Sequence, residues 1–423
     1  MKKMNTSPIS GMQELSPEVQ ATFDKLKNKI VEVYHRHGFL SIETPIIDRS
    51  EILLAKAGGD TEKQIYKVFK TAETASDADQ ALRFDHTVPL ARYVVEHENE
   101  LTFPFKVTQV GRNFRGERAQ RGRFREFYQC DVDVIGRGDL PTYYDADVVA
   151  TLLDAFAGFG LTTPVVARIS NRKILSGLIQ EYNLETQAGE IFSIIDHAEK
   201  VPVEKTLSAF EEIGLGSERV QTMMNFIEIR GSRAEVVEKL RGLGISNEMF
   251  GSGVDELDAV LSMLEADGYA DSVRADMKIV RGLDYYTGTV FEFNLPEYSH
   301  VGSVCGGGRY ENLAGYFTDQ KLPGVGGSIG LTRLFYVLTE NNLLKSQVEK
   351  PLDVAVVPIT ENELPFAIKV AGELRAKGEK ATVVATNKRL GDKLNYAARL
   401  AKEAIVLGEN EVKTGKYEVK HFD

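Results

Sequence analysis

The stretch from Gly111 to Arg125 constrains the fold of this 423-residue chain more than any other. It holds six arginines and one glutamate, and two segments with alternating side chains flank it, Phe105–Val110 and Phe124–Ile135. Such alternation is typical of half-buried strands, so we expect an antiparallel hairpin with an arginine-rich loop. The whole chain has a formal net charge of −11. A local cluster of arginines therefore favours a bound anion such as phosphate over a solvated charged loop.

Length and composition indicate an ordinary globular protein of two or three domains, with 43% hydrophobic and 27% charged residues. No apolar run approaches the length of a membrane span, and no apolar stretch follows the N-terminal lysines. We therefore expect a cytoplasmic protein without membrane contacts. Cys130 and Cys305 lack metal-ligand spacing and are too few for a disulfide framework, so we expect no protein-bound metal.

The first two-thirds of the chain mixes helix and strand signals. Residues 16–38 predict an amphipathic helix. Phe39–Ile47 predicts a strand that Pro45 interrupts, which favours a sheet edge or an interface. Residues 180–269 read as helices separated by glycines, which indicates a helical insertion, and strand character returns at Met277–Val280.

The last part of the chain has a different pattern. Strand and helix signals alternate after a polar linker, which predicts a small α/β domain over residues 351–423 with a largely parallel sheet. The expected strands are Leu352–Ile359, Ala381–Ala385 and Glu403–Leu407, and the expected helices are Glu363–Lys377 and Lys388–Lys402.

Several segments resemble one family. Phe114–Arg118 and Gly122–Gln129 resemble motif 2 of class II aminoacyl-tRNA synthetases, in the version found in histidyl-tRNA synthetases. Arg281–Gly288 (RGLDYYTG) and Ser303–Tyr310 (SVCGGGRY) resemble that family's two histidine-specific motifs. Gly38–Pro45 resembles motif 1, the dimer motif, and Gly330–Leu334 resembles motif 3. The motifs keep the family's order over nearly the whole chain.

The resemblance implies an α+β fold: a class II antiparallel-sheet catalytic core over residues 1–340, a helical insertion at 180–269 within it, and a C-terminal α/β anticodon-binding domain at 351–423. It implies that ATP, with Mg²⁺, activates histidine to histidyl-adenylate, and that histidine then moves to the 3′ end of tRNA-His. It also implies a homodimer formed through the region around Pro45.

The resemblance also implies site residues. It assigns catalysis to Arg281 and Arg115. ATP binding falls to Arg115, Glu117, Arg123, Phe127 and Arg333, and histidine binding to Asp85, Thr87, Gln129, Asp133, Arg281, Tyr285, Tyr286 and Tyr310. Elementary chemistry agrees, because negative charge that builds on the attacked phosphorus is stabilised by fixed cations.

The residues themselves add three expectations. Gln129 and Asp133 lie four apart on an alternating strand, so both should face the side that also presents Arg123, Arg125 and Phe127. His86, between two expected histidine ligands, is expected to serve local packing. Thr332 stands where motif 3 commonly has an acidic residue, which leaves the orientation of the following Arg333 open.

Two other functions remain open at this stage. A relative of the family is a non-catalytic regulatory subunit of ATP phosphoribosyltransferase that senses histidine, but it generally lacks the C-terminal domain and the ATP-binding arginines. A dehydrogenase built on the glycines of residues 324–330 is disfavoured, because their spacing is GxGxxxG and no strand–turn–helix unit follows.

Overall fold

The computed structural model describes residues 4–54, 62–72, 74, 78–119, 122–280, 286–311, 314–344 and 350–422. The chain divides into two compact units, Met1–Gln13 with Lys27–Lys345 and Glu14–Leu26 with Ser346–Asp423. Helix α1 (Pro17–Arg36) has residues in both units. In the described ranges, no helix is long and apolar enough to cross a membrane.

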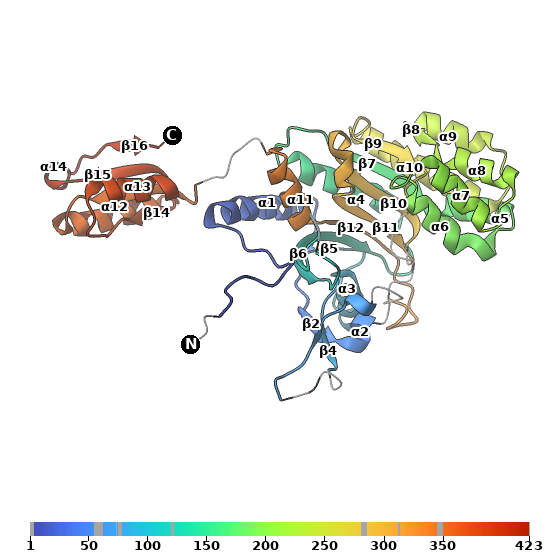
Figure 1. Ribbon diagram of the computed structural model, residues 1–423, viewed down its shortest axis with the longest axis horizontal. Helices are drawn as coiled ribbons and strands as arrows, with labels where there is room; N and C mark the ends of the chain where they lie inside the picture. Colours follow the sequence, from blue (N-terminus) through green and yellow to red (C-terminus); the bar gives the residue numbers. More distant parts are fainter. Residues whose placement is uncertain are drawn as a thin grey trace. The chain divides into compact units, whose positions relative to one another are not determined.

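A mixed but mainly antiparallel sheet forms the centre of the first unit (Figure 1). Among the described residues it has nine strands, which lie side by side in the order β1 (Leu40–Ser41), β5 (Phe105–Phe114), β6 (Glu126–Ile135), β12 (Gly324–Ile329), β11 (Cys305–Tyr310), β10 (Tyr286–Asn294), β7 (Val166–Asn171), β9 (Val273–Asp276) and β8 (Arg230–Gly231). Only the β1–β5 and β7–β9 pairs are parallel within this described sheet. The predicted antiparallel-sheet core is confirmed.

The arginine-rich hairpin is the longest pairing in this sheet. β5 and β6 pair in one unbroken antiparallel register, from Phe105 opposite Ile135 to Phe114 opposite Glu126. The predicted hairpin is therefore correct, and its loop includes the described residues 115–119 and 122–125. The strand expected at Phe39–Ile47 is indeed interrupted before Pro45: β1 lies at the edge of the large sheet, and β2 (Ile47–Arg49) belongs to a small second sheet with β4 (Gln80–Leu82) and β3 (Lys67–Val68).

The glycines of β11 and β12 allow close approach. A Cβ atom on Gly307 would collide with the Gly326 carbonyl oxygen, and one on Gly327 would lie 2.7 Å from Leu152 Cδ1. Leu152 belongs to α4 (Tyr143–Ala157), a helix that packs on β12 and has ten of its fifteen residues buried. Because these glycines carry no side chains, β11 and β12 lie close together and α4 packs closely on the sheet. The glycines of residues 324–330 belong to β12 and the position just after it, and they do not form a dinucleotide loop.

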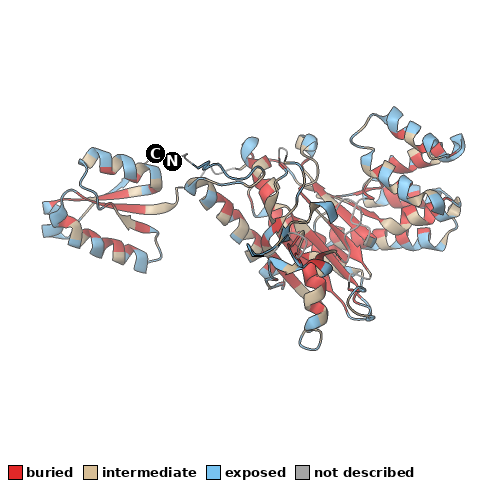
Figure 2. Ribbon diagram, turned by 60° about the horizontal axis from the view of Figure 1, so that its bottom comes forward, coloured by how far each residue is buried: buried red, intermediate tan, exposed pale blue. Residues whose placement is uncertain are grey.

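Helices cover the sheet and extend from its β8 end. α2 (Ser50–Leu54), α3 (Thr87–Glu96) and α11 (Leu331–Glu340) lie near the hairpin side. Residues 172–266 are mostly helical and gather at the opposite side of the sheet (Figure 1). These helices are α5 (Arg172–Glu181), α6 (Ala188–His197), α7 (Val203–Glu212), α8 (Ser217–Ile227), α9 (Arg233–Gly242) and α10 (Glu248–Ala266). Figure 2 shows the buried residues concentrated in the strands and on the helix faces turned to them.

One expected strand is misplaced. Strand β9 covers Val273–Asp276, and Met277–Val280 is not a strand. Asp276 ends β9 with a turn, because its Oδ1 accepts from Lys278 N at 3.0 Å and its carbonyl accepts from Ile279 N at 3.1 Å. Met277, Ile279 and Val280 are nevertheless buried, so their apolar character reflects burial and not strand geometry.

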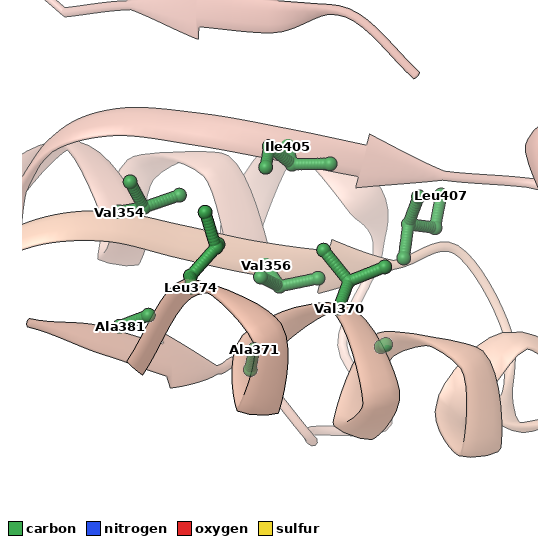
Figure 3. Close-up of a cluster of buried hydrophobic side chains, with 9 residues drawn as sticks. Val354, Val356, Val370, Ala371, Leu374, Ala381, Ile405 and Leu407 are labelled. Carbon is green, nitrogen blue, oxygen red and sulfur yellow. The ribbon is translucent and has the colours of Figure 1, made fainter. Parts of the chain in front are cut away.

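The C-terminal part of the second unit is a small α/β fold. A four-stranded sheet of described residues has the order β14 (Ala381–Val383), β13 (Leu352–Pro358), β15 (Ala401–Leu407) and β16 (Val419–His421), with only β16 antiparallel. α12 (Leu364–Ala376), α13 (Leu390–Leu400) and α14 (Glu409–Thr414) join the strands. Figure 3 shows one half of the core, where α12 packs on the sheet through Val354, Val356, Val370, Ala371, Leu374, Ala381, Ile405 and Leu407.

Candidate active site

A cavity of about 480 Å³ opens at the hairpin side of the large sheet. A smaller cavity of about 30 Å³ continues it, since both share lining residues of β6, β11 and β12. Every expected site residue that the structure describes lines one of the two. The larger cavity has Asp85, Thr87, Arg115, Glu117, Arg123, Phe127, Gln129, Tyr286 and Arg333, and the smaller adds Asp133 and Tyr310. Arg281 and Tyr285 lie outside the described residues.

Strand β6 arranges the chemistry of these cavities in order. Its residues Phe127, Gln129, Asp131 and Asp133 alternate toward one face and line the cavities in sequence. At about 3.4 Å per residue, the span from Phe127 to Asp133 is about 20 Å. Cationic loop residues therefore border one end, and carboxylates lie at the other.

The cationic end is held in shape by aromatic rings. The guanidinium carbon of Arg115 lies 4.3 Å from the centroid of the Phe84 ring and 5.1 Å from that of Phe127. Arg115 Nε also donates to the Phe84 carbonyl oxygen at 3.3 Å. Stacking of this kind orients a planar guanidinium and leaves its in-plane N–H groups directed outward. Arg123 Nη1, the second loop cation, lies 3.4 Å from Glu117 Oε2.

Other arginines of the hairpin serve the scaffold. Arg112 pairs with Glu126 at 3.1 Å across the β5–β6 ladder. Arg125 Nε donates to the carbonyl oxygen of Glu117 at 3.0 Å, and its Nη1 donates to that of Ser10 at 3.3 Å. Part of the local positive charge is therefore balanced within the protein, and the cavity itself receives Arg115 and Arg123.

Thr332 has a definite role at the start of α11. Its Oγ1 accepts from the backbone N–H of Tyr128 at 2.7 Å, which fixes the first turn of α11 to β6. The neighbouring Arg333 donates through Nη2 to the carbonyl oxygen of Val301 and lines the cavity. A hydroxyl thus anchors the helix that presents Arg333.

The acidic end is buried. Tyr310 donates through its hydroxyl to Asp133 Oδ1 at 3.0 Å, and both residues are less than 10% exposed. Burial raises the pKa of Asp133 well above its usual value, and the neighbouring Asp131 and Asp85 carboxylates raise it further, while the Tyr310 hydrogen bond opposes the shift. Such a carboxyl group is suited to a ligand that brings positive charge or N–H donors.

Asp85 combines a structural and a ligand-facing position. Its Oδ1 accepts from the backbone N–H groups of Thr87 at 3.1 Å and Val88 at 3.2 Å, which caps the start of α3. Both bonds use the same oxygen, so Oδ2 can meet a ligand in the cavity. Burial raises the pKa of Asp85, and its hydrogen bond from Val88 and the nearby Arg115 oppose that shift.

Sequence reasoning gave no site role to Asp131, Glu292, Ser303 or Ser328, four polar residues that line the larger cavity. Asp131 could have been found, because it lies between Gln129 and Asp133 with the same strand parity. No signal in the sequence distinguished Ser328 or Glu292 from other polar strand residues. Conversely, Arg309 belongs to a motif but supports the scaffold: it is buried, it pairs with the buried Asp145, and its Nη1 donates to the Leu140 carbonyl oxygen at 2.9 Å.

A second groove of about 930 Å³ adjoins the cavity and shares Glu292, Ser303 and Arg333 with it. It lies between the large sheet and the end of α6, and its lining combines the cations Arg168, Lys200, Arg230, Arg274 and Lys278 with the acidic residues Asp196, Glu199, Asp276 and Glu292. Arg168 pairs with Glu199 and Asp276, and Lys200 pairs with Asp196. In the described part of the chain, no cluster of three or more His, Cys, Asp or Glu side chains is arranged to hold a metal ion.

Comparison with known proteins identifies the family. The sequence model of the histidyl-tRNA synthetase family matches residues 11–334, and that of the anticodon binding domain matches residues 353–423. A histidine–tRNA ligase of Clostridium tetani is 42% identical over 100% of this chain and 96% of its own length.

Solved structures agree with the sequence comparison. The histidyl-tRNA synthetase of Nostoc sp. PCC 7120 superposes with a TM-score of 0.89 at 38% identity, over 99% of this chain and 95% of that one. A Bacillus halodurans protein described as an ATP phosphoribosyltransferase regulatory subunit/histidyl-tRNA synthetase shares the fold, with a TM-score of 0.79 at 22% identity over 96% of this chain and 99% of that one. The resemblance found in the sequence is confirmed, and the chain belongs to the histidyl-tRNA synthetase family.

Proposed function

We propose that this protein joins histidine to tRNA-His in two steps, with ATP as the activating substrate. One observation carries the proposal: connected cavities have the loop cations Arg115 and Arg123 at one end, with Arg115 stacked on Phe84, and the buried β6 carboxyl groups of Asp131 and Asp133 at the other. The first end suits the phosphates of ATP, and the second suits the ammonium and imidazole groups of histidine.

In the first step, a carboxylate oxygen of histidine attacks the α-phosphorus of ATP. The new P–O bond forms as the bond to pyrophosphate breaks, and the leaving group carries away the electron pair. Arg115 donates N–H groups to the α-phosphate oxygens, where charge accumulates in the transition state. Arg281 acts at the same phosphate and at the substrate carboxylate; this role rests on the RGLDYYTG motif.

The remaining ATP contacts surround these two arginines. Arg123 and Glu117, already paired with each other, bind the outer phosphates and the nucleotide, and Phe127 packs against it. Arg333 lies against the adenine ring as a flat cation on an aromatic face.

Histidine binds at the carboxylate end. Asp85 Oδ2 and the Thr87 hydroxyl receive the ammonium group, with Gln129 beside them. Asp133, with Tyr310 bonded to it, accepts an imidazole N–H, and Tyr285 and Tyr286 complete the aromatic wall. A side chain without two ring nitrogens would leave buried polar groups unpaired, which is the physical basis of selectivity.

Mg²⁺ enters with ATP. Magnesium in nucleotide sites keeps several waters and needs only one or two protein carboxylates. Glu117 and Glu292 line the cavity and fit that need, while the described residues offer no cluster for a resident ion. The ion supplies charge neutralisation for the phosphates.

In the second step, a hydroxyl at the tRNA 3′ end attacks the activated carbonyl and releases AMP. The groove next to the cavity, whose lining includes Arg230 and Arg274, suits the approaching 3′ end, because it meets the cavity at Arg333 and Ser303. The helical insertion at 180–269 would then contact the acceptor arm, and the domain at 351–423 the anticodon, with residues 1–340 as the catalytic core.

The proposed assembly is a cytoplasmic homodimer. Leu40, Ile46 and Ile47, next to Pro45, are 64%, 38% and 44% exposed, which suits burial against a second copy. Sedimentation of the purified protein tests this. A purely regulatory, histidine-sensing role is disfavoured, because the ATP-facing arginines and an anticodon-domain match are both present.

Histidine-dependent exchange of labelled pyrophosphate into ATP tests the activation step. We expect exchange with histidine and none above background with the other amino acids. Histidine binding without exchange would instead indicate a sensor. Charging of tRNA-His in a parallel assay tests the transfer step.

A further inference from the structure

The pair formed by His86 and Asp131 lies behind the proposed histidine site. His86 immediately precedes α3 and is 1% exposed, so it does not reach the cavity. Its Nδ1 lies 3.0 Å from Asp131 Oδ2, in a pair that is almost wholly buried. A buried carboxylate needs partners, so this contact is more than packing.

A chain of hydrogen bonds leads from this pair to Gln129. Ser328 Oγ donates to the second oxygen of Asp131, and Gln129 Nε2 donates to Ser328 Oγ at 2.6 Å. The amide is fixed on its other side, because Asn113 Nδ2 donates to Gln129 Oε1 at 2.8 Å. Since the carboxylate can only accept, the serine hydrogen must point to it, and the Gln129 amide must turn its nitrogen to the serine.

The backbone of His86 is tied to the same sheet. Its carbonyl oxygen accepts from Gln109 Nε2 of β5 at 3.3 Å, and Gln109 in turn accepts from Thr44 at 2.8 Å. On either side of His86 in the sequence stand Asp85 and Thr87, which line the cavity. The His86 contacts therefore hold this segment against β5 and β6.

The ring has one hydrogen-bonded nitrogen. With Nδ1–H donating to Asp131, Nε2 has no hydrogen-bond partner among the described residues and lies against Gly111. Only Nδ1 therefore links the ring to another described side chain by a hydrogen bond. Position Nδ1, and not Nε2, thus makes the important contact.

We propose that His86 is a positioning residue for substrate histidine. Through Asp131 it fixes two halves of the binding site at once: the segment that carries Asp85 and Thr87, and, through Ser328, the amide of Gln129. This inference rests on the proposed function, because it assigns these side chains to histidine and not to ATP. Loss of the His86 contact should therefore impair histidine binding selectively.

Three substitutions test the geometry, with pyrophosphate exchange as the assay. His86→Leu removes the donor, and His86→Gln places an amide nitrogen near Nε2, whereas His86→Asn places one near Nδ1. Loss of one buried hydrogen bond to a charged group predicts a KM for histidine about 10-fold or more above wild type in the Leu and Gln variants. The KM for ATP should change less than about twofold, and His86→Asn should restore most of the histidine affinity.

A matched control lies elsewhere in the same unit. His37 Nε2 contacts Asp154 Oδ2 at 2.9 Å, and neither residue lines the two cavities. His37→Leu should lower thermal stability without changing the KM for histidine relative to that for ATP. If His86→Leu fails to fold, the comparison of His86→Gln with His86→Asn decides the question.

A double variant gives a second, independent test of the link between His86 and Ser328. Ser328→Ala breaks the same chain, so the His86→Gln/Ser328→Ala double variant should raise the histidine KM by less than the product of the single effects. Equal changes in both KM values, no change in either, or no rescue by Asn would overturn the inference. The wild-type protein is measured in the same assay. If it shows histidine-dependent exchange while the variants give one of these outcomes, the positioning role of His86 is wrong and the proposed function still stands.

Discussion

Asp133→Asn should affect stability and histidine binding in opposite directions. Asp133 lies in a buried site beside Asp131 and Asp85, and its pKa in the folded protein is well above the usual value, chiefly because of burial. In the unfolded chain the group titrates near pH 4. The folded protein therefore loses stability as pH rises from that value through the raised pKa, because the buried carboxyl must become charged.

Asparagine does not titrate, and it keeps an oxygen that can accept from Tyr310. As pH rises between the unfolded and the folded pKa of Asp133, the free energy of unfolding of the variant should therefore increase relative to that of the wild type by about 1.4 kcal/mol per pH unit. Above the folded pKa the difference should stay constant. Denaturant unfolding of the ligand-free proteins at pH 5, 6.5 and 8 measures this trend. Tyr310→Phe is the contrast, since it keeps the carboxyl group but removes the hydrogen bond that lowers its pKa.

Histidine affinity should change the other way. The variant loses a charged acceptor for an imidazole N–H, which is worth about 1.5–3 kcal/mol, or about 10- to 150-fold in Kd. The proposed ATP contacts lie at the other end of β6, so the Kd for ATP should stay within about twofold. Calorimetric titration with each ligand measures both values. A pH-independent stability difference, or equal weakening of both ligands, would refute the reasoning.

Four further predictions concern other parts of the chain. Arg115→Ala should slow pyrophosphate exchange about 10²–10³-fold, because it removes a cation aimed at the reacting phosphate; near-wild-type exchange would contradict this. Arg281→Ala should slow adenylate formation in single-turnover assays by a similar factor with a smaller loss of substrate affinity, and lysine should recover only part of the rate. Arg309→Leu should lower the free energy of unfolding by about 3–5 kcal/mol, since it leaves Asp145 buried and unpaired; adding Asp145→Leu should recover much of the loss, and an equally unstable double variant would argue against a buried ion pair. Removal of residues 351–423 should leave histidine activation largely intact and weaken tRNA charging, and equal loss of both in a folded product would count against it.

The sequence predicts the architecture well where local signals are strong. Alternation on both sides of the arginine cluster is sufficient to place the β5–β6 hairpin, and the alternation of strands and helices after residue 351 predicts the C-terminal sheet. Met277–Val280 shows the limit, because an apolar run reports burial and the Asp276 turn decides that the strand has already ended. Local propensity cannot decide between those outcomes without the tertiary contacts.

The site was predictable to the extent that it follows strand parity and motif resemblance. The resemblance named Gln129, Asp133 and the arginines, and strand parity placed Gln129 and Asp133 on one face. The partners of the neighbouring Asp131 were not predictable, since Ser328 and His86 meet it from positions 197 and 45 residues away in the sequence. Long-range polar pairing of this kind depends on the register of whole strands, which no local pattern encodes.

The glycines next to β6 connect the fold to the chemistry. A Cβ atom at Gly326 would collide with the Asp133 carboxylate, and one at Gly111 would collide with the buried Arg83 and lie 3.3 Å from His86 Nε2. Strands normally disfavour glycine, because it contributes no side chain to packing. Here the missing side chains leave room on both neighbours of β6 for buried ionisable groups, which an ordinary close-packed sheet would exclude. Gly326, one of the glycines that resemble a dinucleotide loop in the sequence, thus provides space for Asp133 at the proposed histidine site.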